Sequence, residues 1–225
     1  MHSNRIQAAE GCGGLDLTDS IFRLLSCFAI VLDCAMPALA ARRIGVTPLD
    51  EERMRDVVRF TARTLNTAYP APFGALIVNT KTGERLMRAT NAVMRENDPS
   101  SHAEVRTVRL ACKKLKRRQS RDWRTRGPSL AGYTMYSTCE PCPMCMANAL
   151  WAKLDRVVFG ATIADANRHC MQIHIPAKEV ARRSDMSCAV EGPVLRELCY
   201  TLFTHPNMLK AFRTWSSRKE NPGKS

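Results

Sequence analysis

Three cysteines spaced three residues apart, Cys139, Cys142 and Cys145, are the densest group of metal-binding side chains in this 225-residue sequence. They lie in the segment Cys-Glu-Pro-Cys-Pro-Met-Cys, and His102 precedes the middle cysteine by forty residues, with Glu104 two residues further on. Three thiolates and the imidazole would close a tetrahedral zinc site and make it structural. Two thiolates and the imidazole would leave the fourth position open to water. The number of cysteine ligands therefore decides whether the site can do chemistry.

The local sequence separates Cys139 from the other two cysteines. Pro141 restricts the residue before it to extended geometry, and Cys139 ends a predicted strand. Cys142 and Cys145 begin a predicted helix, where unpaired N–H groups and the positive end of the helix dipole favour thiolates. We therefore predict Cys142, Cys145 and His102 as the ligands of a zinc ion, and we keep the closed site with Cys139 as the alternative.

Glu104 gives the open site a use. Two thiolates and a neutral imidazole balance the charge of Zn²⁺, which brings the pKa of a bound water towards about 7. A carboxylate two residues beyond the ligand His102 is expected to reach that water rather than the metal. It can remove the proton of the water, deliver it to a ring nitrogen and then protonate a departing amine. The predicted reaction is a hydrolytic deamination that releases ammonia.

The elements that must position these residues can be read from the apolar spacing. Helices alternate with strands, which indicates an α/β layer structure with a central sheet. Helices are expected over residues 50–66, 102–116, 143–153 and 193–203, and strands over 73–79, 85–94, 133–138 and 156–161.

The length predicts one main domain with terminal extensions. Residues 1–46 form an N-terminal extension whose apolar stretch ends in Ala38-Leu39-Ala40, a small-x-small pattern typical of signal-peptidase sites, although Asp33 interrupts the stretch. Cleavage near Ala40 would imply export, and a dispensable extension would imply a cytoplasmic protein. Neither alternative attaches the mature chain to a membrane. A basic tail is expected over residues 206–225.

The net charge of +13 indicates an anionic partner or a basic surface that serves solubility. Eight of the fourteen residues in the run 113–126 are basic, and Trp123 lies among them. Such a run could bind the phosphates of a polynucleotide such as tRNA, with Trp123 as a stacking surface. The commoner meaning of such a run is the solvated end of a helix.

His-Ala-Glu at 102–104 and Pro-Cys-Pro-Met-Cys at 141–145 match the His-x-Glu and Pro-Cys-x-x-Cys signature of zinc-dependent deaminases. With PFGALIV at 72–78 and the segment 133–162, the chain resembles nucleobase deaminases of the cytidine-deaminase fold, and most of all the bacterial-type guanine deaminase branch. The resemblance covers about two-fifths of the chain. It implies a three-layer α/β/α sandwich around a mixed five-stranded sheet, a CMP/dCMP-type deaminase domain over 47–205, and a homodimer.

The resemblance also implies roles for individual residues. Glu104 corresponds to the proton shuttle, and Asn91 to the asparagine that hydrogen-bonds the substrate base. Phe73 would stack on a purine, although a core aromatic is equally expected there. Trp151 matches a tryptophan that closes the pocket, with core packing as its alternative. Asp165 matches an acidic residue that recognises the amide and amine edge of guanine, with a helix cap as its alternative.

Three functions follow from these observations. The first is a zinc-dependent aminohydrolase that acts on a purine base or nucleoside, with guanine to xanthine as the leading reaction. The second is deamination of adenosine to inosine in tRNA, which the basic run favours. The third, from another class, is a nucleic-acid-binding protein with a structural zinc. Release of ammonia separates the first two functions from the third.

Overall fold

The computed structural model describes residues 45–118, 127 and 129–220, and it describes no side chains for residues 117, 118 and 216–220. The predictions for residues 1–44, including the cleavage site near Ala40, lie outside the described residues. The same holds for Trp123 and for residues 119–126 of the basic run. The part of that run that is described ends a helix.

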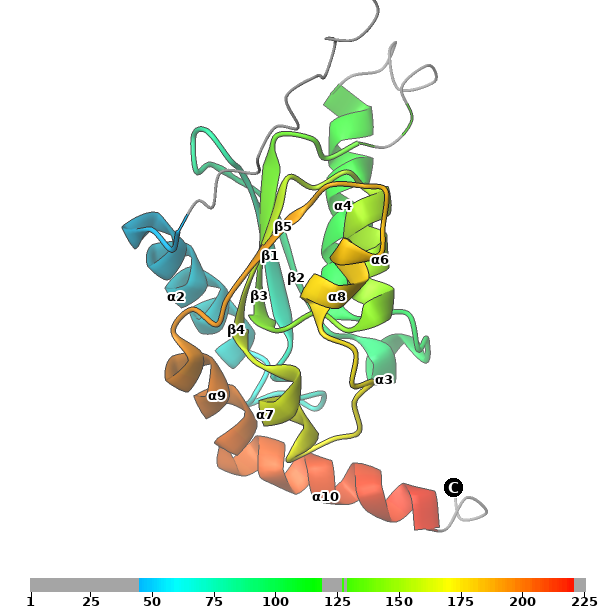
Figure 1. Ribbon diagram of the computed structural model, residues 1–225. Coiled ribbons are helices and arrows are strands. Elements are labelled where there is room, and N and C mark those ends of the chain that lie inside the picture. Colours follow the sequence, from blue (N-terminus) through cyan, green and yellow to red (C-terminus); the bar gives the residue numbers. More distant parts are fainter. Residues whose placement is uncertain (1–44, 119–126, 128, 221–225) are drawn as a thin grey trace, which may run out of the picture. The chain divides into compact units, whose positions relative to one another are not determined.

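A mixed sheet of five strands lies at the centre of the described part of the chain (Figure 1), in the order β2-β1-β3-β4-β5. The strand β1 pairs antiparallel with both β2 and β3, whereas β3, β4 and β5 run parallel. This confirms the expected mixed five-stranded sheet. The bounds are β1 Gly74–Asn79, β2 Arg85–Thr90, β3 Tyr133–Cys139, β4 Arg156–Ala161 and β5 Ala189–Glu191.

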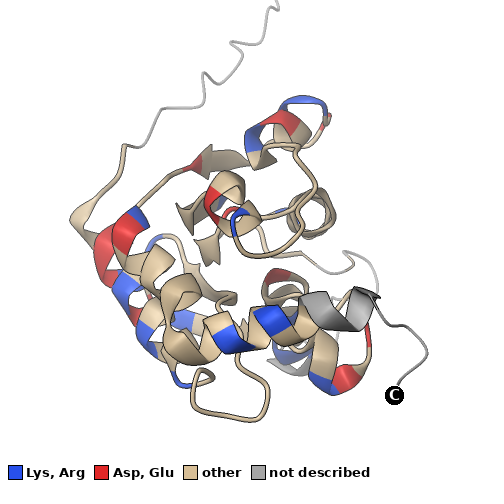
Figure 2. Ribbon diagram, turned by 90° about the horizontal axis from the view of Figure 1, so that it is seen from below, with Lys and Arg blue, Asp and Glu red and all other residues tan. Residues whose placement is uncertain are grey.

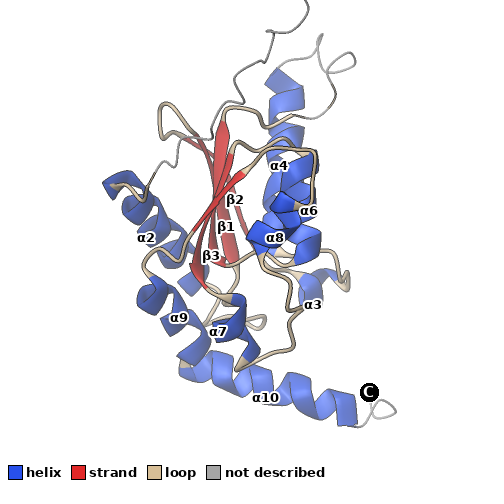
Figure 3. Ribbon diagram, viewed as in Figure 1, coloured by secondary structure: helices blue, strands red, loops and turns tan. Residues whose placement is uncertain are grey.

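Helices cover both faces of the sheet (Figure 3), which confirms the three-layer α/β/α class. The first face carries α4 (Ala103–Arg118), α6 (Pro143–Trp151) and α8 (Ala177–Arg182). The second face carries α2 (Pro48–Ala62) and α9 (Arg196–Thr204), and α10 (Pro206–Glu220) packs on α9. Two short helices, α3 (Val93–Glu96) and α7 (Ile163–Asn167), follow β2 and β4.

The helix α2 shows how the local sequence forms an element and the tertiary structure uses it. Thr47 caps its N-terminus and Asp50 completes a capping box, while Pro48 occupies the first turn, where a missing N–H costs nothing. Met54 and Val57 are fully buried against the sheet. Because Asp50 is also buried, its carboxylate needs partners besides the cap.

Asp50 finds those partners in a charged cluster under α2. Arg156 Nη1 and Nη2 donate to its two oxygens at 2.5 and 2.9 Å, and the Tyr136 hydroxyl donates at 2.7 Å. Arg156 also bonds Glu191, so the cluster joins α2 to β3, β4 and β5. Burial by itself would raise the pKa of Asp50, but the hydrogen bonds from Arg156, Tyr136 and Thr47 outweigh it and hold the pKa at about 2.

The C-terminal region corrects one expectation. The predicted basic tail is largely the helix α10, in which Met208 and Phe212 are buried and Trp215 is partly buried. These three residues lie at i, i+4 and i+7, the spacing of an apolar helix stripe. The basic residues between them masked this stripe. Residues 206–220 therefore belong to the packed domain.

Other differences concern short elements and boundaries. The second strand of the hairpin ends at Thr90 and is followed by α3, because Asn91 bonds the backbone N–H of Val93 and begins a turn. The elements α3, α7, α8 and β5 were not located from the sequence, since each has six residues or fewer and too few periods of an apolar pattern. No helix among the described residues has the length and apolarity that crossing a membrane requires.

The buried cluster generates a prediction about stability. Replacing Arg156 with methionine leaves the Asp50 carboxylate buried without its counter-ion, and we expect the free energy of unfolding to fall by about 3–5 kcal/mol. Urea denaturation followed by circular dichroism measures the change. Arg182→Gln removes an exposed ion pair with Glu179 and serves as the matched control, which should leave the midpoint almost unchanged. Equal midpoints for the two variants would contradict a stabilising role of the cluster.

Candidate metal centre

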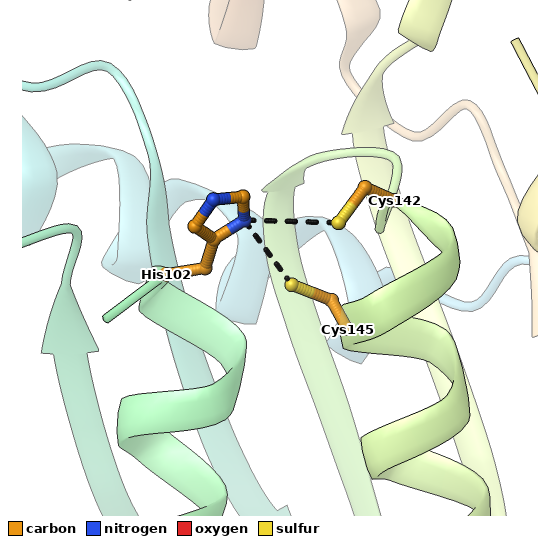
Figure 4. Close-up of side chains that lie close together, drawn as sticks. All are labelled: His102, Cys142 and Cys145. Carbon is orange, nitrogen blue, oxygen red and sulfur yellow. Dashed lines mark hydrogen bonds between the residues drawn. The ribbon is translucent and has the colours of Figure 1, made fainter. Parts of the chain in front are cut away.

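Two helices on the same face of the sheet begin beside each other and bring His102, Cys142 and Cys145 together (Figure 4). His102 lies one residue before α4, Cys142 is the N-cap of α6, and Cys145 follows in the first turn. The Nδ1 atom of His102 lies 3.7 Å from the Cys142 sulfur and 3.5 Å from the Cys145 sulfur. The three ligand atoms all lie within 4.8 Å of one another, close enough to hold one metal ion.

The distances agree with the size of a zinc ion. Zinc binds thiolate sulfur at about 2.3 Å and imidazole nitrogen at about 2.1 Å, so two such ligands at the tetrahedral angle lie about 3.6 Å apart. The distances from Nδ1 to the two sulfurs bracket this value. Two thiols and one imidazole are also donors that zinc prefers. The residues therefore fit zinc in both chemistry and spacing.

Local sequence places each ligand at a helix start. Pro143 opens α6 and fits the first helical position, and Cys142 before it is extended (φ −64°, ψ 166°). The hydroxyl of Ser101 donates to the carboxylates of Glu96 and Asp98. That contact tightens the turn before His102, whose carbonyl accepts from Arg106 N–H in the first turn of α4.

The thiols and the imidazole shift each other's protonation. A hydrogen bond from the Cys145 thiol, with a smaller contribution from His102, lowers the pKa of Cys142 to about 4. The same contact raises the pKa of Cys145, where burial adds to the effect. The bond to Cys142 raises the pKa of His102. Cys142 is therefore the thiol that ionises first.

Glu104 lies next to this group and is almost completely buried, with 5% of its surface exposed. Its Oε2 atom is 3.4 Å from the Cys145 sulfur, and its Oε1 atom accepts a hydrogen bond from Ser137 at 3.1 Å. Burial raises the pKa of this carboxyl group. The sequence analysis missed Ser137. Its place two residues after Met135 in β3, on the face that α4 covers, was the available signal.

Cys139 lies outside the group that could hold a metal. It is buried with Cys199 and Phe203 in the core under α9, and its thiol points to the carbonyl oxygen of Thr162 at 3.7 Å. Burial raises its pKa well above the ordinary value. The closed site with Cys139 as a fourth ligand therefore disagrees with the geometry, because the end of β3 turns this side chain into a different contact.

Asn91 and Phe73 lie side by side and are joined through the backbone. The Asn91 N–H donates to the Phe73 carbonyl at 3.0 Å. Asn91 lines a cavity of about 530 Å³, and its Oδ1 atom accepts from Val93 N–H. The Phe73 ring is half-buried and meets Phe203 edge to face at 5.3 Å, as a core aromatic would. The roles predicted for both residues in binding the substrate stay predictions.

Trp151 and Asp165 are held differently. Trp151 ends α6, roughly 13.5 Å along the helix axis from Cys142, and 73% of its surface is exposed, so it neither packs in the core nor reaches the metal group of its own chain. Asp165 forms a capping box with Thr162 and pairs with Arg196 through both carboxylate oxygens. The geometry agrees with the alternative expectation that Asp165 is a helix cap. The role of Asp165 in base recognition stays a prediction.

A mixed sheet that brings an imidazole, two thiols and a buried carboxylate to the starts of two neighbouring helices defines the class of zinc-dependent deaminases with the cytidine-deaminase fold. Residues 48–161 match the family described as the cytidine and deoxycytidylate deaminase zinc-binding region. The chain belongs to this family, and it is a deaminase.

Relatives and solved structures agree with this assignment. Guanine deaminase of Bacillus subtilis is 30% identical over 170 residues, which cover 76% of this chain and 97% of that protein. A tRNA-specific adenosine deaminase of the same species is 35% identical over 112 residues, 50% of this chain and 62% of that protein. The structure of guanine deaminase from Nitrosomonas europaea matches in fold, with a TM-score of 0.58 at 21% identity over 76% of this chain and 87% of that one.

The geometry predicts how the cysteines differ in metal content. We expect Cys142→Ser to reduce bound zinc from one equivalent to well below half, because a hydroxyl is a poor replacement for a thiolate ligand. Cys139→Ser should keep one equivalent, because its thiol contacts a carbonyl oxygen elsewhere. Inductively coupled plasma mass spectrometry on the purified variants measures both. Stoichiometric loss of zinc from Cys139→Ser would instead support the closed site in which Cys139 is the fourth ligand.

Proposed function

We propose that this protein hydrolytically deaminates a purine base or nucleoside, with guanine to xanthine and ammonia as the leading reaction. The observation that carries the proposal is the buried carboxylate of Glu104 beside His102 and Cys145, which a structural zinc site would not need. The guanine deaminase relative supports the choice of guanine, because the match extends over 97% of its length.

In this proposal His102, Cys142 and Cys145 hold the zinc ion. Bound there, zinc would supply a Lewis acid that makes water nucleophilic near neutral pH. Glu104 accepts one proton of the attacking water and delivers it to a ring nitrogen of the base. It then takes the proton of the hydroxyl group added to the ring carbon and gives it to the leaving amine, so that a carbonyl remains on the ring and ammonia departs. The hydrogen bond from Ser137 to Oε1 holds the carboxylate in one orientation, so Oε2 stays directed at the reacting atoms.

Asn91 is proposed to orient the base. Its Oδ1 atom is already bonded to Val93 N–H, and its Nδ2 group has no hydrogen-bond partner in the part of the chain that the structure describes. An amide held in this way offers donors in a fixed direction to an acceptor atom of the substrate. Phe73, whose carbonyl anchors Asn91, is proposed to lie against the ring of the purine.

Deamination of adenosine in tRNA is the second candidate. The observation that favours it is the relative that deaminates tRNA, at 35% identity, together with the basic charge of the chain. We also propose a homodimer. Trp151 and Met144 on α6 and Met171 and Ile173 in the loop after α7 are exposed apolar side chains that a second copy would cover.

The proposed role of Glu104 gives a prediction about turnover. Glu104→Gln keeps the size of the side chain but cannot accept a proton, and we expect kcat to fall at least about 10³-fold while one equivalent of zinc stays bound. Ammonia release and metal content are measured on the same preparation. Ser137→Ala keeps the carboxylate and should lose less activity. Loss of zinc from the glutamine variant would count against a role in proton transfer.

The choice of substrate is tested with a panel of guanine, guanosine, adenine, adenosine, cytosine, cytidine and a tRNA anticodon stem, each scored for ammonia. We expect guanine or guanosine to react fastest. Reaction of the RNA alone would favour the second candidate over the first. Binding of RNA without ammonia from any substrate would favour a nucleic-acid-binding protein with a structural zinc.

A further inference from the structure

A cavity of about 530 Å³ among the described residues has a size within the range of small-molecule sites. The loop 65–71 forms one wall, the start of α3 a second and α10 a third. Asn91, the residue proposed to orient the base, lines it as well. A free base would occupy only part of this space.

The backbone connects the cavity to the metal centre. The residue after Asn91, Ala92, also lines the cavity and donates its N–H to the carbonyl of Ser101 at 2.9 Å. Ser101 directly precedes the ligand His102. A molecule whose base reaches Asn91 would therefore have this cavity next to it for its remaining atoms.

The charge of the lining favours an anion. Arg95 and Lys210 line the cavity, and none of the described residues that line it is acidic. The nearest carboxylate to Arg95, that of Glu96, is shared with Arg106 and Arg109, at 2.9 and 3.6 Å, so one negative charge serves three guanidinium groups. The Lys210 ammonium has no ion pair among the described residues. Two cations with incomplete compensation therefore face the same space.

The helix α10 is positioned to present Lys210 to the cavity. Asn207, Lys210, Ala211 and Thr214 line it at i, i+3, i+4 and i+7, which is one face of a helix. Asn207 Nδ2 donates to the Leu65 carbonyl and to Asn66 Oδ1, both at 3.0 Å, and so fastens this face of α10 to the opposite wall. Figure 2 shows the bands of basic residues along α10.

We propose that this cavity binds the phosphate of a purine nucleoside monophosphate through Arg95 and Lys210 while the base lies at the metal centre. The inference rests on the proposed function and narrows its substrate class from bases and nucleosides to phosphorylated nucleosides. A single terminal phosphate fits a space that α10 bounds on one side and the loop 65–71 bounds on the other.

The experiment compares guanosine with guanosine 5′-monophosphate on the zinc-loaded full chain. The nucleotide should have a KM at least about 10-fold below that of the nucleoside, and the difference should shrink as salt rises. In Lys210→Gln and Arg95→Gln we expect the ratio of kcat/KM for nucleotide over nucleoside to fall about 10-fold each, because a hydrogen bond to a charged group is lost. Equal ratios in the wild type and both variants would overturn the proposal.

Arg213→Gln is the matched control, because Arg213 is an exposed basic residue of α10 that does not line the cavity. In this variant the ratio of kcat/KM for nucleotide over nucleoside should equal that of the wild type. A fall as large as in Lys210→Gln would assign the effect to the general charge of the helix and would contradict a phosphate site in the cavity. Inorganic phosphate should compete with the nucleotide and not with the nucleoside. If the wild type prefers the RNA stem to the monophosphate and Lys210→Gln loses this preference, the proposal is wrong and the cavity binds a polynucleotide.

Binding measurements separate this inference from the proposed function. Calorimetry on Glu104→Gln compares the affinities of nucleoside and nucleotide without turnover. Suppose that no substrate yields ammonia, that the nucleotide binds at least about 10-fold more tightly than the nucleoside, and that Lys210→Gln removes this difference. The proposed purine substrate is then wrong, whereas the phosphate site is supported. If guanosine yields ammonia and the nucleotide binds no better, the proposed function stands and the phosphate site falls.

Discussion

The meeting of two helix starts at one edge of the sheet is the constraint on which the site depends. The Nδ1 atom of His102 before α4 and the sulfur of Cys142 at the start of α6 come within 3.7 Å of each other because α4 packs on β1 and α6 packs beside α4. Unpaired backbone N–H groups at these starts favour the thiolates that a metal requires. Any shift of one helix along the sheet would separate the imidazole from the sulfurs.

A second constraint acts on the opposite face. Asp50, Arg156 and Tyr136 join α2 to the middle strands, and the hydrogen bonds of the carboxylate outweigh the cost of its burial. The parallel strands β3 and β4 carry Tyr136 and Arg156 in neighbouring positions, and the same two strands flank α6 in the chain. The cluster therefore ties α2 to the two strands between which α6 lies in the chain.

Chemistry and recognition come from different layers. The metal-binding group, Glu104 and Ser137 belong to α4, α6 and β3, whereas the cavity is formed by the loop 65–71, α3 and α10. The family match ends at residue 161, and α10 lies beyond it. In the proposed phosphate site, Lys210 would therefore act on the choice of substrate from an element outside the metal-binding group.

The sequence by itself determined the reacting side chains and the elements that carry them. Spacing placed His102, Glu104, Cys142 and Cys145 at helix starts, since capping and proline signals are local. Apart from α10, the long periodic elements were located to within a few residues. Only the tertiary structure decided that Ser137 bonds Glu104, that Cys139 points into a different core and that Asp50 meets Arg156, 106 residues away. It also decided that residues 206–220 form a packed helix beside Asn91. These contacts join residues far apart in the chain, and short-range periodicity carries no information about such pairs because packing alone selects them.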